Sequence, residues 1–228
     1  MSGGLDSTTV LMIAKSMGFE AHAISFDYGQ RHEVELQALR KVLQAHGAAS
    51  HKEVSVDLNT IGGSALTDFE IDVPKRDDIK NHTQGVPVTY VPARNTIFLS
   101  IALGYAETIG ALDIFLGINA IDYSNYPDCR PDYLTAFENM ANLATAAVDT
   151  DKRYTFHAPL LKDSKADIIK KGLALGVDYS ITQSCYDPNP EGMACGRCDA
   201  CSLRLVGFHQ NGMADPAPYA YRPDMTGC

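Results

Sequence analysis

Ser2-Gly-Gly-Leu-Asp-Ser7 stands at the start of this chain and leads directly into a segment with helical spacing. The apolar residues from Leu5 to Met17 recur at that spacing, and Gly18 follows as a stop signal. Two adjacent glycines let a backbone turn sharply and expose consecutive N–H groups. A helix that begins there adds positive partial charge from its dipole. The stretch therefore predicts an anion cradle that suits pyrophosphate.

Two other Gly-rich phosphate loops do not match this stretch. It lacks the Lys-Ser/Thr ending of a Walker A loop and the G-x-G-x-x-G spacing of a dinucleotide-binding loop. A plain helix cap, in which Ser and Asp are the capping residues, is the alternative interpretation. In the cradle, Asp6 would help to hold Mg²⁺ beside the phosphates. The ATP-binding residues that we predict are Ser2, Gly3, Gly4, Leu5, Asp6, Ser7, Thr8, Asp27 and Tyr28.

Outward from this loop, apolar strand-like runs alternate with helical runs. We expect further helices over 31–46, 95–108, 131–147 and 164–175, and strands over 21–26, 52–56 and 112–117. Ser164-Lys-Ala-Asp167 has the capping-box pattern, with Asp in place of Glu, and opens the last helix. The alternation predicts an α/β, Rossmann-like fold, in which a parallel twisted sheet carries helices on both faces. Ligands in such sheets bind outside the carboxyl ends of the strands.

Composition favours small-molecule chemistry. The 228 residues are 45% hydrophobic, which is enough for one sizeable core or one core with a small appendage. The net charge is -9 and no basic tract stands out, so we expect no direct nucleic-acid partner. The most apolar segment, 96–118, is interrupted by Glu107 and Asp113 and predicts no membrane span. With no signal peptide at the N-terminus, we expect a cytoplasmic protein.

Four of the six cysteines crowd into a short segment near the end of the chain. Cys185, Cys195, Cys198 and Cys201 form C-x9-C-x2-C-x2-C. Such spacing gathers four thiolates around one metal ion, and a closed four-thiolate zinc site is structural. An iron–sulfur cluster is the alternative. We expect residues 1–180 to form the nucleotide-binding domain and 181–228 a zinc-binding segment packed on it.

Polar loops at the expected ligand-binding edge supply further candidates. Asp27 and Tyr28 follow the strand over 21–26 and could meet the adenosine. Arg94 precedes a helix and can neutralise a phosphate through its planar fork, or it is simply a surface Arg. The loop over 117–130 is dense in hydrogen-bonding and aromatic groups, which suit a flat polar heterocycle. Its candidate substrate-binding residues are Asp122, Tyr123, Tyr126, Asp128 and Arg130.

Ser-Gly-Gly-x-Asp-Ser is the signature of the PP-loop ATP pyrophosphatases, and the chain resembles that family. Members split ATP between the α- and β-phosphates, release pyrophosphate and leave AMP on a substrate oxygen. The resemblance implies an adenine nucleotide alpha hydrolase-like fold. In the family the loop follows a hydrophobic first strand, whereas here Met1 directly precedes Ser2. We therefore expect a central strand to be missing from the sheet, through a misassigned start or a truncation.

Further motifs narrow the resemblance to the branch of this family that serves queuosine biosynthesis. They are F-D-Y-G-Q-R-H at 26–32, V-P-x-R-N at 91–95, D-Y-S-x-Y-P-D-C-R at 122–130, S-K-A-D at 164–167 and the cysteine pattern. The resemblance runs from Ser2 to about Phe208. It implies that 7-carboxy-7-deazaguanine and ammonia are converted to 7-cyano-7-deazaguanine through adenylated intermediates, with release of AMP and pyrophosphate.

The resemblance also implies roles and partners. The catalytic residues would be Asp6, Arg94 and Lys165, with the loop ending at Arg130 receiving the deazapurine. One Zn²⁺ per chain, Mg²⁺ with ATP, and a homodimer are expected. Two rival hypotheses stay open. One is a tRNA-thiolating enzyme of the same family, in which Cys129 carries sulfur. The other is a non-catalytic zinc-knuckle binding module.

Overall fold

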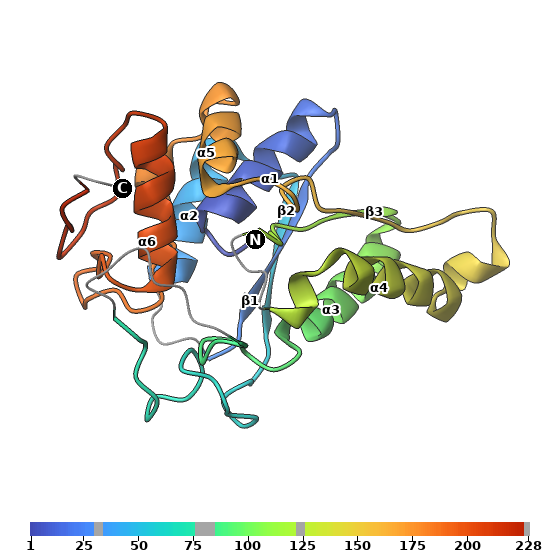
Figure 1. Cartoon of the computed structure of the whole chain (residues 1–228). Helices are drawn as coiled ribbons and strands as arrows, with labels where there is room; N and C mark the ends of the chain where they lie inside the picture. Colours follow the sequence, from blue (N-terminus) through green and yellow to red (C-terminus); the bar gives the residue numbers. More distant parts are fainter. Residues whose placement is uncertain (30–33, 76–84, 122–125, 226–228) are drawn as a thin grey trace.

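The computed structural model describes residues 1–29, 34–75, 85–121 and 126–225 (Figure 1). Its helices are α1 (Leu5–Ser16), α2 (Val34–His46), α3 (Arg94–Ile109), α4 (Pro131–Ala144), α5 (Lys165–Ala174) and α6 (Asp199–Gln210). Its strands are β1 (His22–Asp27), β2 (Ser50–Ser55), β3 (Asp113–Phe115) and β4 (Thr155–His157). Short 3-10 turns occupy η1 (Pro127–Cys129), η2 (Ala146–Asp149) and η3 (Tyr179–Ile181).

All the strand pairing in the described residues is parallel, so the predicted α/β class with parallel strands is confirmed. In β1 and β2, His22 lies opposite Ser50, and in β3 and β4, Asp113 lies opposite Thr155. These strands form two separate pairs and not the one continuous sheet that the sequence predicts. The physical reason is that no described strand lies between β1 and β3 to join them. In that position the Met1 ammonium donates to the Ile24 carbonyl oxygen at 2.5 Å.

The capping box predicted for the helix at 164–175 is present. The Asp167 N–H donates to Ser164 Oγ at 3.2 Å, and the Ser164 N–H donates to Asp167 Oδ2 at 3.1 Å. Two N–H groups that a helix start leaves without helical partners are thereby satisfied. The cap fixes the position of Lys165, which is the first residue of α5.

Three apolar clusters hold the elements together. One joins α1, α5 and α6 through side chains that include Val10, Ile168 and Phe208. A second joins α3, β3, α4 and β4, and the third joins the loop after β1 to the cysteine segment. Figure 1 shows α1, α5 and α6 grouped on one side of the strands and α3 and α4 on the other. The C-terminal segment thus shares a core with the rest, and the division at 180/181 stays a prediction.

Two elements were not predicted from the sequence, namely β4 and α6. A strand of three residues is too short to show alternation of polar and apolar positions. Helix α6 begins beside the cysteines, whose spacing we interpreted only as a metal site. The described parts of the irregular stretch, 59–75 and 85–92, contain turns but no helix or strand. Among the described residues, every helix is too short or too polar to span a lipid bilayer.

Candidate active site

The Gly-rich loop folds tightly against the first turn of α2. Gly3 has a φ of 77°, in the left-handed region that favours glycine. A Cβ at Gly3 would lie 2.8 Å from the Glu35 carbonyl oxygen and would also collide with the Leu39 backbone. Only glycine therefore allows α2 to approach the loop so closely. The approach brings the side chains at the start of α2 toward the same cavity as the loop.

The N–H groups at the start of α1 have weak partners that an anion can replace. Gly4 is the residue before the helix, and its N–H donates to Ser2 Oγ at 3.3 Å. The Leu5 N–H donates to Ser184 Oγ, also at 3.3 Å. Both bonds are at the long end of the range for N–H···O hydrogen bonds. Because the helix dipole adds positive charge at this point, phosphate oxygens would be stronger acceptors than the two hydroxyls.

Asp6 and Lys165 form an ion pair between α1 and α5. Lys165 Nζ lies 2.8 Å from Asp6 Oδ1 and 3.0 Å from Oδ2, and the Lys165 side chain is 7% exposed. A Cβ at Gly207 would lie 2.9 Å from Lys165 Cγ, so this glycine lets α6 pack closely over the lysine. The packing keeps the lysine beside the first turn of α1. A cation is therefore held next to the predicted pyrophosphate cradle.

Arg94 begins α3 after a strained residue. Ala93 has a φ of 53°, and it alone among the described non-glycine residues has a positive φ. Such a conformation costs about 1 kcal/mol or more, and strain of this kind clusters at functional sites. The Arg94 guanidinium lies over the Tyr28 ring, 5.9 Å from its centroid. Burial works to lower the pKa of Arg94, but Tyr28 and other nearby acidic groups raise it above its usual value. The guanidinium therefore stays charged.

Asp128 is a buried residue of η1 whose carboxylate contacts the start of α3. Its Oδ2 accepts from the Asn95 N–H at 3.1 Å, and the Asn95 side-chain amide donates to the Asp128 carbonyl oxygen at 3.1 Å. Its Oδ1 is buried without a hydrogen-bond partner among the described residues. A buried acceptor left unpaired is costly, so a donor from a bound molecule would stabilise it.

A cavity of about 350 Å³ connects these groups, and its size is within the range of small-molecule sites. Its polar lining includes the Gly-rich loop, Arg94, Asn95 and Tyr186. Apolar side chains of β1 and β3, such as Ile24 and Ile114, also line it. The lining thus combines a cradle for phosphates with aromatic and amide groups that can hold a heterocycle.

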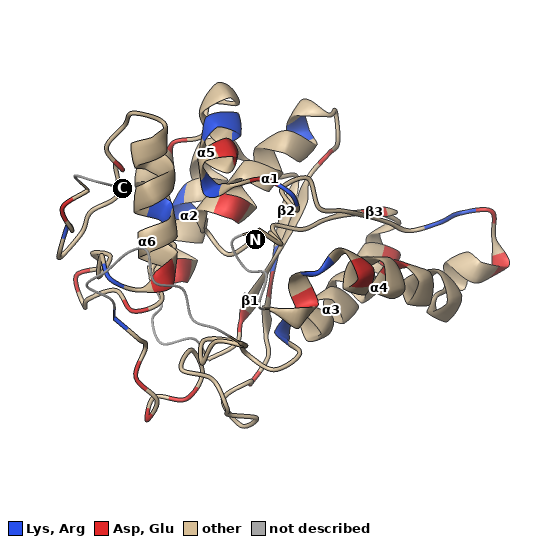
Figure 2. Cartoon of the chain, in the orientation of Figure 1, with Lys and Arg blue, Asp and Glu red and all other residues tan. Residues whose placement is uncertain are grey.

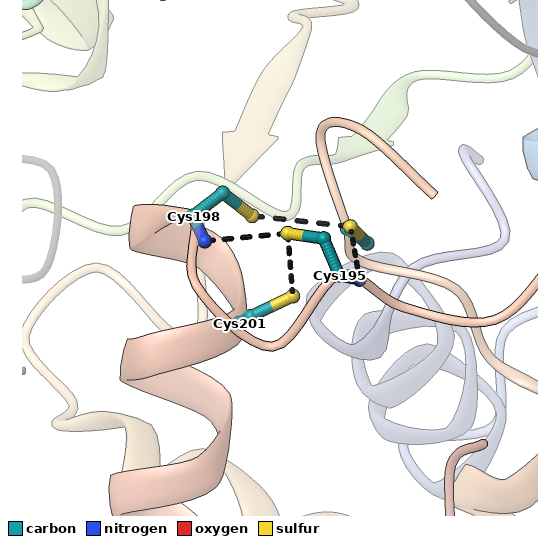
Figure 3. Close-up of side chains that lie close together, drawn as sticks. Cys195, Cys198 and Cys201 are labelled. Carbon is teal, nitrogen blue, oxygen red and sulfur yellow. Dashed lines mark hydrogen bonds between the residues drawn. The ribbon is translucent and has the colours of Figure 1, made fainter. Parts of the chain in front are cut away.

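The four cysteines predicted as metal ligands lie together. Their sulfur atoms are all within 4.8 Å of one another, and Figure 3 shows the three labelled residues pointing toward one another. Sγ–Sγ distances are 3.9 Å for Cys185 and Cys198, and 4.0 Å for Cys195 and Cys201. Four sulfurs bound at about 2.3 Å around one tetrahedral ion lie about 3.8 Å apart. The cluster therefore fits a single metal ion.

Backbone N–H groups also point at the sulfurs, as thiolates require. The Cys195 and Asp187 N–H groups donate to Cys185 Sγ at 3.2 and 3.3 Å, and the Cys198 N–H donates to Cys195 Sγ at 3.4 Å. Hydrogen bonds from backbone N–H groups favour the deprotonated form of a thiol, which is the form that binds metal.

Comparison with known proteins identifies the family. The model of the family described as "Queuosine biosynthesis protein QueC" matches residues 1–212. The chain belongs to the QueC family. It is 59% identical to the 7-cyano-7-deazaguanine synthase of Cellvibrio japonicus (strain Ueda107) over 221 residues, which cover 97% of this chain and 96% of the relative. The synthase of Geotalea daltonii is 61% identical over 222 residues, covering 97% and 95% of the two chains. Membership of the QueC family places the protein in queuosine biosynthesis.

Within this QueC chain, the residues predicted from the sequence fall into three groups. Those that line the cavity are Ser2, Gly4, Leu5, Asp6, Ser7, Tyr28, Arg94 and Tyr126. Six predicted residues lie outside this lining, namely Gly3, Thr8, Asp27, Asp128, Arg130 and Lys165. Of these, Lys165 reaches the site through Asp6, and Asp128 reaches it through Asn95. Asp122 and Tyr123 are outside the described residues. The roles assigned to all these residues stay predictions.

Other lining residues of the QueC cavity were not singled out from the sequence. Ser184 and Tyr186 flank the first cysteine and lie beside the Gly-rich loop, and the Gln183 N–H donates to the Gly3 carbonyl oxygen at 3.0 Å. Their position next to Cys185 was a usable signal, because a metal site fixes the residues around it. Glu35 is another lining residue that was not singled out. Its only feature in the sequence was its place in the first turn of a helix that follows a polar stretch.

Proposed function

We propose that this chain converts 7-carboxy-7-deazaguanine to 7-cyano-7-deazaguanine with ammonia and ATP. The observation that carries the proposal is the near-complete alignment with synthases of that name, together with a cavity that joins an anion cradle to a polar heterocycle site. A carboxylate is a poor electrophile, so its oxygen must be converted to a leaving group. Transfer of AMP from ATP does this and releases pyrophosphate.

The reaction needs two adenylations. The substrate carboxylate first attacks the α-phosphorus, which gives an acyl adenylate, and ammonia then displaces AMP to form the amide. The amide oxygen next attacks the α-phosphorus of a second ATP, and loss of AMP with protons from nitrogen leaves the nitrile. Each step gathers negative charge at the phosphates. Catalysis of this kind depends on positioning and on cations placed where that charge develops.

The chain's own residues divide this work in the proposal. The N–H groups of Gly4 and Leu5 hold the pyrophosphate, and Lys165 offsets its charge while Asp6 orients the lysine and helps to bind Mg²⁺. Arg94 neutralises charge on the transferred nucleotidyl group or on the substrate carboxylate. Asp128 fixes the position of Asn95, which lines the cavity and hydrogen-bonds the deazapurine.

We propose zinc as the ion of the cysteine cluster. Four thiolates around one ion form a closed tetrahedral site, which leaves no open position for a reactant. Such a site supplies folding free energy and fixes the surrounding chain. Because Gln183 and Ser184 contact the Gly-rich loop and Cys185 comes next, the metal would fix one wall of the active site.

The rival role of Cys129 as a sulfur carrier is not favoured. Burial, together with the charge of Asp128, raises the pKa of the Cys129 thiol to about 12. Such a thiol is almost entirely protonated at neutral pH and is a weak nucleophile. A non-catalytic module is not favoured either, because the relatives named as synthases align with nearly the whole chain.

Mass spectrometry of the products tests the proposal directly. The protein is incubated with the deazaguanine acid, ammonium and Mg-ATP, and we expect the nitrile with AMP and pyrophosphate. The control is the same mixture without the deazaguanine acid, in which no AMP should form. Turnover of ATP to ADP and orthophosphate, or formation of no nitrile, would contradict the proposal.

A further inference from the structure

Glu35 is an acidic side chain in the wall of the cavity with no role in the steps described so far. It lies in the first turn of α2, where Gly3 brings the helix against the loop, and it lines the cavity together with Asp6 and Arg94. The residue is half-buried, so it is not sealed in the core.

Its surroundings favour the neutral acid at low pH and the carboxylate only near neutrality. Burial raises the pKa of Glu35 to about 7, and the charge of Arg94 opposes the rise. Burial also raises the pKa of Tyr28, so this phenol stays neutral. A group with a pKa near the working pH is the most effective acceptor and donor of protons. The other ionisable groups that line the same cavity are the Met1 ammonium, Asp6, Tyr28, Arg94, Tyr126, Cys129, Cys185 and Tyr186.

We propose that Glu35 is the general base that takes protons from the attacking nitrogen as the nitrile forms. The inference rests on the proposed function, because only an amide-forming and nitrile-forming reaction requires such a group. Ammonia brings three N–H bonds and the nitrile has none, so three protons must leave the nitrogen in each full turnover.

In each step, every bond that forms is matched by a bond that breaks. When ammonia attacks the acyl adenylate, the C–N bond forms, Glu35 takes one proton from the nitrogen, and the C–O bond to AMP breaks with its electron pair leaving on AMP. In the second half the amide oxygen bonds to the α-phosphorus and pyrophosphate leaves. The nitrogen then loses two protons, one after the other, as the second C–O bond to AMP breaks and the triple bond forms. Glu35 returns each proton to solvent through the open side of the cavity.

The other groups in the cavity fit this role less well. Asp6 is held by Lys165 at 2.8 Å, and burial raises the pKa of the Cys129 thiol to about 12. No histidine lines the cavity among the described residues. Burial lowers the pKa of the Met1 ammonium to about 6, but that nitrogen is engaged with the Ile24 carbonyl oxygen of β1. Glu35 is therefore the group in the cavity lining best suited to accept protons.

The test compares the full chain with E35Q and E35D, with Glu53→Gln as a matched surface control; Glu53 lies on β2 and its side chain is 39% exposed. Nitrile formation is followed from pH 5.5 to 8.5 at a constant concentration of free ammonia, so that protonation of this substrate does not shape the profile. For the unchanged chain and E53Q we expect kcat to rise with pH through about 7, because Glu35 must be ionised. E35Q should lose this rise and lower kcat by about 100-fold or more, as general base catalysis predicts, with the KM for ATP little changed.

E35D keeps a carboxylate and should retain the pH dependence with a smaller loss of rate. This variant also tests the inference if E35Q does not fold. Mass spectrometry should show the amide accumulating in E35Q, because the last step removes two protons. A pH profile and rate of E35Q like those of the unchanged chain would overturn the inference and leave the nitrile synthesis intact. Failure of the unchanged chain to form nitrile would instead overturn the proposed function.

Discussion

At the scale of single residues, the proposed site depends on one buried cation. Lys165 is 7% exposed and its ammonium contacts both oxygens of Asp6, although the two residues are 159 positions apart in the chain. A buried charge is tolerated only where a partner and hydrogen bonds offset its loss of water. The ion pair therefore holds the lysine at the first turn of α1, where the leaving pyrophosphate would lie.

Replacement of this lysine should slow catalysis. K165A removes the charge that stabilises the developing pyrophosphate, and we expect pyrophosphate release to slow by about 100- to 1,000-fold. The matched control is K171A on the same helix, since Lys171 pairs with Asp163 at 2.6 Å but is 46% exposed. A surface pair of that kind contributes about 0–1 kcal/mol, so K171A should retain its activity. Equal rates for both variants would contradict the role of Lys165.

At the scale of elements, the cysteine cluster determines where α6 begins. Cys198 is the residue before α6 and Cys201 lies in its first turn, as the two labelled side chains in Figure 3 show. Helix α6 in turn packs on α5, which carries Lys165. The metal would thus stabilise the active-site lysine indirectly, through two helices.

Loss of one thiolate should therefore reduce metal content, stability and activity together. For C198S we expect less than one zinc per chain by elemental analysis and a fall in Tm of at least about 5 °C, which corresponds to about 2 kcal/mol for a chain of this size. C129S is the control, because Cys129 lies in η1 outside the cluster. Full zinc content in C198S, or iron in the unchanged chain, would contradict the assignment.

Helix α4 presents an apolar face to solvent that suits a second copy of the chain. Its side chains Met140 and Leu143 are 40% and 75% exposed, and Val148 in the following η2 is 45% exposed. Figure 2 colours most of α4 tan, with no Lys or Arg along it. Contiguous exposed apolar patches mark protein–protein interaction sites. We propose that this face forms the contact of a homodimer.

A single charge in that face should separate the two copies. For L143E we expect light scattering after size-exclusion chromatography to give the mass of one chain, whereas the unchanged protein gives two. L173E is the control, since Leu173 is 37% exposed on α5, away from this face. A dimeric L143E, or an unchanged chain that is already monomeric, would rule out α4 as the contact.

At the scale of the whole molecule, local patterns predicted more than long-range arrangement did. The capping box at Ser164 and the four-cysteine spacing were visible because a few neighbouring residues determine each feature. The roles of Glu35 and Ser184 were not visible, because they depend on α2 and the cysteine segment meeting the Gly-rich loop from distant parts of the chain. Nor could local sequence show that the strands form two pairs, since that depends on what lies between them.

The space between the two strand pairs gives the last prediction. Its walls include Ile24 and Phe26 of β1 and Ile114 of β3, and the Met1 ammonium lies against β1. An engineered extension of about six apolar β-branched residues before Met1 should pair with β1 and fill this space. Because apolar burial stabilises by about 25 cal/mol per Å², we expect Tm to rise by about 5 °C or more in calorimetry.

The same extension should change how stability depends on pH. Burial lowers the pKa of the Met1 ammonium from 8.0 to about 6, so between these values the unfolded chain binds more protons than the folded one. Stability of the unchanged chain should then rise as pH increases from 6 to 8, by linkage. An extension moves the charge away and should remove that part of the slope. A Gly/Ser extension of equal length is the control. It should remove the slope without raising Tm, because it has no apolar side chains to bury. An equal rise in Tm with both extensions would mean that the space between β1 and β3 does not accept a strand.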